Sequence, residues 1–332
     1  MTDHELERPP TALGESDARP STVVVHNPVK SGAFQKFYEV DDNHIETELL
    51  FRSRPNPALY SEHHDLLVKA IADHIGCVVY LTELLEPGLF EEILAKNPNQ
   101  VFTRDSLITL PWVPDGFFCA RLKPIQRQIE SDVMKIAAKK LGLREIFSLP
   151  DRVFLEGGDV IPFAYDGRRC LLVGYGPRST RDAIDYLQSA ILPEYADEII
   201  AIRLAPWRMN LDGGFVPVAD NVVVSDTQSL VEAELISSAS RAKIDVFEML
   251  RALKINVIDT NADESVYCQS CNCLCLGQRE IICYDLSPRV AALISQYDIR
   301  LHRIPGVELI KGRGGPRCMS RPIYLKQSLK EH

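Results

Sequence analysis

The chain has 332 residues, of which 45% are hydrophobic and 25% are charged, and this composition is ordinary for a globular protein. Its 46 acidic and 37 basic residues give a net charge of −9, whereas proteins that bind nucleic acid carry dominant basic patches. No apolar run reaches the roughly 18 residues that a membrane-spanning helix needs. We therefore expect no nucleic-acid partner and no association with a membrane.

The first twenty residues are acidic, contain prolines and lack the apolar segment of a secretory signal. We expect residues 1–20 to form a disordered tail and residues 21–332 to form a single domain. The chain has nine cysteines and no such signal, which favours a reducing, cytoplasmic compartment and free thiols.

Short segments rich in β-branched or aromatic residues alternate along the chain with segments whose apolar residues recur every three or four positions. This alternation predicts the α/β class. The predicted strands cover residues 21–26, 77–81, 169–174, 221–225 and 280–284. The predicted helices cover residues 61–75, 126–141, 179–192, 230–253 with a break near Ser240, and 288–297.

Five polar segments typical of turns recur at intervals of roughly 50 residues, and each interval has room for strands and a helix. Such a period indicates a supersecondary unit repeated five times, because one unit cannot bury its apolar face alone. Five units around one axis would bring carboxylates, an amide and a thiol into one acidic site. The alternative is a plain α/β sheet whose loops share this chemistry by coincidence. The segments are FTRD, EGGD, NLD, QSCN and GGPRC, which end at Asp105, Asp159, Asp212, Asn272 and Cys318.

The most informative thiol is Cys318, which follows the glycine-rich sequence GRGGPR. Arg313 and Arg317 lie close to it in sequence, and nearby cations lower the pKa of a thiol and so favour the nucleophilic thiolate. We therefore expect Cys318 to be a nucleophile. The alternative is a buried structural cysteine, which is the commoner role of this residue.

A second group of cysteines lacks the partners of a zinc site, because its CxxC pair has no matching cysteines or histidines at a usual spacing. Three of its members alternate like residues on one face of a strand, so we expect them to pack in the core. No histidine–carboxylate cluster is visible in the sequence either, and we expect no metal and no other cofactor. The group consists of Cys268, Cys271, Cys273 and Cys275.

Several carboxylates lie in turn-like motifs rather than on helical surfaces. A carboxylate recognises a guanidinium well, because its two oxygens accept two parallel N–H bonds. The alternative is that these side chains only cap loops. The residues are Asp105, Glu156, Asp159 and Asp212.

The ordered motifs FTRD, EGGD, MNLD and GRGGPRCMS resemble those of arginine deiminases in the guanidino-group modifying superfamily. The resemblance covers about 300 residues, includes GYGPRSTRDAI at residues 174–184, and leaves only the N-terminal tail outside. It implies the superfamily's five-bladed α/β propeller of the pentein type. It also implies that the extra helical domain of bacterial arginine deiminases is missing, since only a short stretch separates Glu62 from Asp105.

The resemblance implies a cysteine-dependent hydrolase that acts on free L-arginine or a close derivative and releases a ureido product and ammonia. Cys318 would attack the guanidinium carbon and form a covalent adduct. Asp105 and Asp212 would hold the guanidinium nitrogens, and Glu156 would assist.

The resemblance also implies contacts to the rest of the substrate. Arg178 would hold the substrate carboxylate, which favours a free amino acid over a protein-bound arginine. Asn99, three residues before Phe102, would make a polar contact in the binding site, and Arg313 would lie near the thiolate and guard the empty site. The only partner expected is this small guanidino substrate, and a homo-oligomer is compatible with the sequence.

The chain departs from the family at Asn210, where the family's motif has a histidine that protonates the leaving amine and then activates water. Asparagine cannot titrate, and we expect the site to lack this proton carrier. Three alternatives remain open for a natural residue: another group carries protons, the cysteine adduct has a different outcome, or the protein only binds arginine. The different outcomes are transfer to an amine, as in an amidinotransferase, and double hydrolysis to ornithine. A fourth alternative is that Asn210 is not natural and was engineered in place of the family's histidine.

Overall fold

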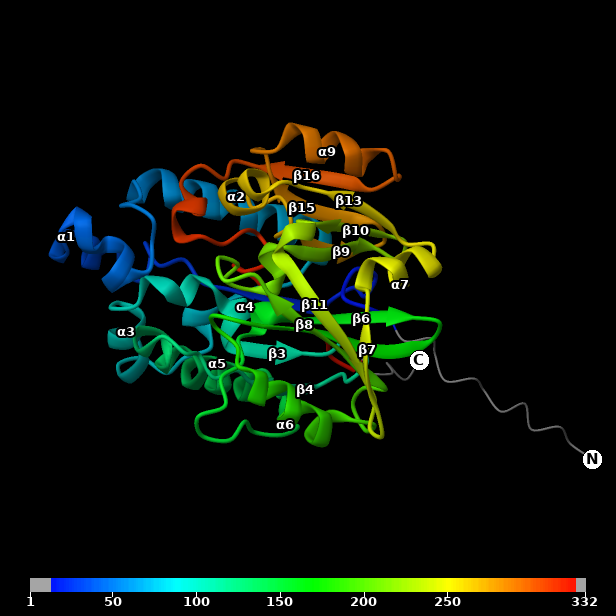
Figure 1. Cartoon of the computed structure of the whole chain (residues 1–332). Helices are drawn as coiled ribbons and strands as arrows, with labels where there is room; N and C mark the ends of the chain where they lie inside the picture. Colours follow the sequence, from blue (N-terminus) through cyan, green and yellow to red (C-terminus); the bar gives the residue numbers. More distant parts are fainter. Residues whose placement is uncertain (1–12, 327–332) are drawn as a thin grey trace, which may run out of the picture.

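A computed structural model describes residues 13–326, and its strands form five separate sheets (Figure 1). Four sheets have three strands and one has five strands. In Figure 1, α9 (Pro288–Ser295) lies along one side of the molecule and α6 (Arg181–Ile191) along the opposite side, with strands between them. Among the described residues, no helix combines the length and apolar character required to cross a bilayer.

The same strand pattern occurs in all five sheets: a first strand pairs antiparallel with a second, and a third strand pairs parallel with the second. A helix connects the second and third strands each time, because parallel neighbours need a long crossover whereas antiparallel neighbours need only a turn. We call these units repeats one to five.

Repeat one contains β17 (Arg321–Ile323), β1 (Thr22–Val25), α2 (Pro57–Ile75) and β2 (Val78–Tyr80). Repeat two contains β3 (Leu107–Thr109), β4 (Gly116–Cys119), α5 (Ile129–Lys140) and β5 (Arg144–Glu145). Repeat three contains β6 (Val160–Tyr165), β7 (Arg168–Tyr175), α6 and β8 (Glu198–Leu204). Repeat four contains β9 (Phe215–Ala219), β10 (Val222–Ser225), α7 (Val246–Ala252) and β13 (Asn256–Asp259). Repeat five contains β14 (Leu274–Gly277), β15 (Glu280–Tyr284), α9 and β16 (Arg300–Ile304).

Repeat one joins the two ends of the described chain. Its first strand, β17, comes from the C-terminal end and pairs antiparallel with β1, with Thr22 opposite Ile323. The remaining short helices are α1 (Lys36–Glu39), α3 (Leu89–Leu94), α4 (Thr103–Ser106) and α8 (Ala262–Tyr267).

All five predicted strands and four of the five predicted helices are present, but the helix predicted over residues 230–253 is confirmed only in its C-terminal part. That segment forms β11 (Leu230–Ile236), β12 (Arg241–Ile244) and then α7. β11 pairs antiparallel with β8, and the register shifts between Leu230 and Glu232. Ala233 and Ile236 point to opposite faces of the strand and are buried in different apolar clusters, so their three-residue spacing imitates that of a helix.

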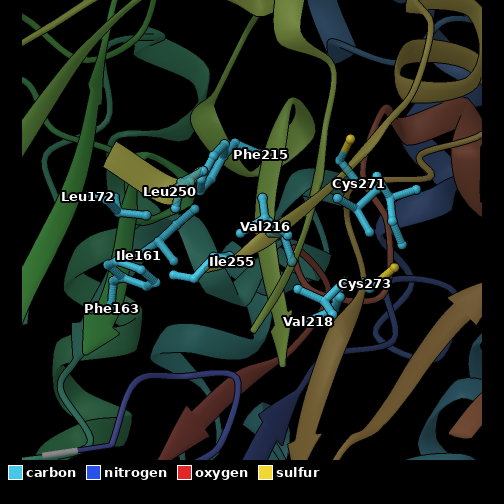
Figure 2. Packing of buried hydrophobic residues seen from close by; sticks show 14 of the residues in the cluster. Ile161, Phe163, Leu172, Phe215, Val216, Val218, Leu250, Ile255, Cys271 and Cys273 are labelled. Atoms are coloured by element: carbon cyan, nitrogen blue, oxygen red, sulfur yellow. The ribbon is translucent and has the colours of Figure 1, made fainter. Parts of the chain in front are cut away.

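Three of the grouped cysteines pack in the core, as predicted. Cys271, Cys273 and Cys275 are buried members of one apolar cluster that also contains Val216 and Val218 of β9 (Figure 2). All nine cysteines are free, and burial raises the pKa of these three thiols, so they are not poised to react.

The prediction that residues 1–20 form a disordered tail is wrong for residues 13–20. Residues 1–12 lie outside the described residues, but residues 13–20 lie against the domain, where the N–H of Glu15 donates to the carbonyl of Pro162 at 2.9 Å. The buried Glu15 carboxylate accepts two bonds from Arg317, at 3.1 and 2.8 Å, and lies 2.9 Å from Arg104. Sequence composition suggests a solvated acid here, whereas two buried guanidinium groups require it as their counter-ion.

Burial alone would raise the pKa of Glu15, but Arg104 and Arg317 lower it to about 2. The stabilisation from this ion pair is therefore complete above the unfolded-state pKa of about 4.5 and is lost as the pH falls toward 2.

We predict that Glu15→Gln lowers the free energy of unfolding by about 3 kcal/mol at neutral pH, because it leaves buried guanidinium charge uncompensated. Urea unfolding of the full chain measures this change. The matched control is Glu39→Gln, which removes an exposed carboxylate paired with Lys36. Equal unfolding midpoints for the two variants would show that Glu15 is not a structural counter-ion.

Candidate active site

The predicted polar segments occupy equivalent places in the fold. Each lies just before the first strand of its repeat, so the five repeats present their polar turns in the same way. The residues in these places are Cys318 before β17, Asp105 before β3, Asp159 before β6, Asp212 before β9 and Asn272 before β14.

Asn272 and Asp212 fix the position of the Cys318 side chain. The Nδ2 group of Asn272 donates to Sγ of Cys318 at 3.1 Å, and Oδ2 of Asp212 lies 3.4 Å from the same sulfur. The Oδ1 atom of Asn272 accepts the backbone N–H of Cys318 at 3.0 Å and that of Gly315 at 3.1 Å. One amide therefore holds both the backbone and the thiol of this loop.

The expected activation of Cys318 by nearby arginines is wrong for the ligand-free protein. Burial raises the pKa of the Cys318 thiol well above its usual value, and the carboxylates of Asp212 and Asp105 raise it further. Arg317 lowers the pKa only in part, because its guanidinium is bonded to Asp212 at 2.8 Å and to Glu15. Arg313 forms an ion pair with Glu46. A cation bound beside the sulfur would lower the pKa of this thiol and favour the thiolate.

Asp105 keeps one carboxylate oxygen free. Its Oδ2 accepts from Nη1 of Arg127 at 3.0 Å, whereas its buried Oδ1 has no hydrogen-bond partner within residues 13–326. Burial raises the pKa of Asp105 and Arg127 lowers it, with a net value of about 7. A Cβ on Gly158 would lie 2.9 Å from Oδ1 of Asp105 and 3.3 Å from Oδ1 of Asp212. Both carboxylates therefore face the same small space.

Asn210, at the position of the missing histidine, is held by two acids. Its Nδ2 donates to Oε2 of Glu156 at 3.0 Å and to Oδ2 of Asp159 at 3.1 Å. The other oxygen of Glu156 accepts from Nη1 of Arg178 at 3.0 Å. Asp159 also accepts from the backbone N–H of Leu211 at 2.7 Å, so it positions this loop rather than facing a substrate.

Two cavities border the Cys318 thiol. The small cavity has a volume of about 20 Å³, and the large cavity has a volume of about 230 Å³. Asp212 lines the large cavity. Glu156 accepts hydrogen bonds from Arg178 and Asn210, and these two residues line the small cavity. The other predicted site residues all line the small cavity, namely Asn99, Phe102, Asp105, Arg178, Asn210, Arg313 and Cys318.

The structure adds Arg127, which the sequence analysis missed, and shows how the predicted residue Asn99 is held. Arg127 lines the small cavity, pairs with Asp105 and Glu130, and lies 5.6 Å from the ring of Phe102. Nothing in the local sequence distinguishes it from a surface arginine at the start of a helix. Asn99 donates its side-chain amide to the carbonyl of Leu49 at 2.9 Å.

The sequence showed no histidine–carboxylate cluster, but the fold brings one together. Within the described part of the chain, the side chains of His74, Glu280 and His302 come together. They line neither cavity at Cys318.

A sequence profile of arginine deiminases matches residues 91–324. The chain belongs to the arginine deiminase family. It is 25% identical over 259 residues to an arginine deiminase of Borrelia garinii subsp. bavariensis, a match covering 70% of this chain and 62% of that protein. This family member therefore spans less than two thirds of that relative's length. It is also 28% identical over 289 residues to the uncharacterized protein YkgA of Bacillus subtilis, covering 87% of this chain and 84% of that protein.

Solved structures share the mixed α/β fold of this family member. The N-terminal domain of ArgZ, a cyanobacterial arginine dihydrolase, has a TM-score of 0.68 at 18% identity, covering 93% of this chain and 98% of that one. A dimethylarginine dimethylaminohydrolase has a TM-score of 0.65 at 15% identity, covering 92% of this chain and all of that one.

We predict that Asp105→Asn speeds alkylation of Cys318 by iodoacetamide severalfold between pH 8 and 10. In this range Asp105 is ionised and raises the pKa of the thiol, so its neutral replacement increases the thiolate fraction. Peptide mass spectrometry measures the rate at Cys318 itself. The matched control is Asp132→Asn, which changes an exposed carboxylate of α5. An unchanged or slower rate in Asp105→Asn would contradict the electrostatic coupling.

Proposed function

We propose that the protein is a cysteine-dependent hydrolase that attacks the guanidinium carbon of free L-arginine or a close derivative. The observation that carries this proposal is the placement of the Cys318 thiol beside two acids that face one space. Asp105 and Asp212 come from different repeats, and neither would approach the thiol by local sequence alone. Membership of the arginine deiminase family supports the same chemistry.

The proposed fold is a five-bladed α/β propeller of the pentein type without an inserted helical domain. Five repeats with the same strand order support it, and so does repeat one, which is built from both ends of the described chain. A closed ring of five such repeats explains why equivalent turns meet at one site. The proposed domain includes residues 13–20, which pack against it, together with residues 21–326; residues 327–332 of the expected domain lie outside the described part of the chain.

The charges of the site suit a guanidinium group. A planar cation with several N–H donors would bond to the free Oδ1 of Asp105 and to Asp212. Arg178 borders the same cavity and would hold the carboxylate of a free amino acid. The small cavity has a volume of only about 20 Å³, so arginine would have to extend into the larger cavity or displace side chains on binding. The ion pair between Arg313 and the exposed Glu46 is the contact we expect to open.

Substrate binding would activate the nucleophile. The arriving cation offsets the carboxylates that keep the Cys318 thiol protonated, so its pKa falls when the substrate is in place. The thiolate then forms a C–S bond to the guanidinium carbon, a C–N bond breaks, and ammonia leaves. Water next attacks the same carbon, the C–S bond breaks, and the ureido product and free thiol are released.

Asp105 is the group we propose as proton carrier in place of the missing histidine. Its buried Oδ1 has no hydrogen-bond partner within residues 13–326, and Asp105 lines the same cavity as Cys318, so this oxygen could accept a proton there. It would take the thiol proton and return it to the departing ammonia. Asn210 cannot titrate, and no histidine is among the described residues that line either cavity.

A second candidate is an arginine dihydrolase, which would use two water molecules to break all three C–N bonds of the guanidinium carbon and yield ornithine, two molecules of ammonia and carbon dioxide. The replacement of the histidine by Asn210 favours considering it, because altered proton transfer can change how the adduct breaks down. The shared fold with ArgZ, described as an arginine dihydrolase, is compatible with this product.

The test is product analysis after incubation of the full chain with L-arginine. We expect citrulline and ammonia in equal amounts, and no turnover in Cys318→Ala. The exposed Cys77, replaced in Cys77→Ala, is the matched control and should leave turnover unchanged. Ornithine with two equivalents of ammonia would establish the dihydrolase, and ornithine formed only with an added amine would establish an amidinotransferase. Stabilisation by arginine without any product would overturn the proposal in favour of a binding protein.

A further inference from the structure

Three ligand-type side chains from distant parts of the sequence meet away from Cys318. His74 lies near the end of α2 in repeat one, whereas Glu280 begins β15 and His302 lies in β16, both in repeat five. The Oε2 atom of Glu280 is 3.4 Å from Nε2 of His74 and 3.4 Å from Nε2 of His302. All three ligand atoms lie within 4.8 Å of one another.

These separations fit a shared metal ion better than they fit hydrogen bonds. A distance of 3.4 Å is long for an N–H···O bond, which is usually 2.7–3.2 Å. Ligands about 2.0–2.1 Å from a tetrahedral zinc ion are about 3.3–3.5 Å from each other. The distances from Oε2 of Glu280 to the two imidazole Nε2 atoms thus match the distance between two ligands of one zinc ion.

Hydrogen bonds to groups outside the cluster orient two of its three side chains. Nδ1 of His74 must donate to the carbonyl of Ala70, 2.7 Å away, which leaves the lone pair on Nε2 directed to the cluster. Oε1 of Glu280 accepts from Nη1 of Arg300 at 2.9 Å, which leaves Oε2 as the single ligand oxygen. Metal-binding residues are commonly oriented by such second hydrogen bonds.

The cluster is accessible but not fully solvated. The side chains of His74, Glu280 and His302 are 24%, 22% and 21% exposed. The imidazole rings have centroids only 3.9 Å apart, so two protonated rings would repel each other, whereas a metal binds both in the neutral form.

We propose that His74, Glu280 and His302 form a site for a zinc ion, with water as the fourth ligand. Two imidazoles and one carboxylate are a ligand set that zinc accepts. The bound ion would tie the end of α2 to the sheet of repeat five, and so link the first and last repeats. The site lines neither cavity at Cys318 and does not depend on the function proposed above.

Calorimetric titration of the metal-free full chain with zinc sulfate tests the site. We expect one equivalent to bind, with affinity lowered at least about tenfold in His302→Ala and in the near-isosteric Glu280→Gln. His44→Ala, which removes an exposed histidine, is the matched control and should bind as the unaltered protein does. Titration with cobalt chloride separates this site from the cysteines, because nitrogen and oxygen ligands give no thiolate charge-transfer band.

Thermal unfolding provides a second readout. Zinc sulfate should raise the Tm of the unaltered protein and of His44→Ala by a few degrees, and should leave that of Glu280→Gln unchanged, because only a folded site binds the ion. Failure of the unaltered protein to bind zinc would overturn the proposal. The proposal would also be overturned if the His302→Ala and Glu280→Gln variants bound zinc as tightly as the unaltered protein does. A cobalt spectrum that showed only thiolate bands would overturn it as well.

Discussion

Arg317 and Cys318 together make hydrogen bonds to all four other repeats, through their backbone and through the Arg317 guanidinium, and the geometry of the site depends on this constraint. A nucleophile held by one flexible loop would lose its alignment with the acids, whereas here each repeat fixes it from a different direction. The backbone N–H of Arg317 donates to the carbonyl of Asn272 in repeat five at 3.2 Å, and the carbonyl of Cys318 accepts from the N–H of Arg104 in repeat two at 3.1 Å. The guanidinium of Arg317 donates to the carbonyl of Val160 in repeat three at 3.2 Å and to Asp212 in repeat four at 2.8 Å.

The same network places charge where water is excluded. Arg104 and Arg317 are both almost fully buried, and Glu15 and Asp212 are the acids that offset them. A buried ion pair contributes little net stability, but the loss of one partner is costly. The N-terminal segment that carries Glu15 is therefore part of the support for Asp212 and, through it, for the thiol. Asp212 offsets the charge of Arg317 and, together with burial, raises the pKa of the Cys318 thiol, which a bound cation would lower.

Much of the site could be predicted from sequence because its residues lie in turns that recur with the period of the fold. The recurrence singled out Asp105, Asp212 and Cys318, and the structure shows that each lies just before the first strand of its repeat. Features that depend on contacts between distant segments could not be read locally. The acidic N-terminal segment gives no sign in the sequence that Glu15 neutralises buried arginines. Arg127 lies in no recognisable sequence motif. The metal-type cluster escaped detection because His74 lies more than 200 residues before Glu280 and His302.

The chemistry of Cys318 is tested most directly by the intact mass of the protein after rapid acid quenching of its reaction with L-arginine. A hydrolase of the proposed kind gains the mass of arginine less ammonia, and fragmentation places that gain on Cys318. A gain of the amidino group alone would instead show transfer chemistry, because the amino-acid part has already left. An unchanged mass under conditions where product accumulates, or the same gain in Cys318→Ala, would contradict nucleophilic catalysis by this thiol.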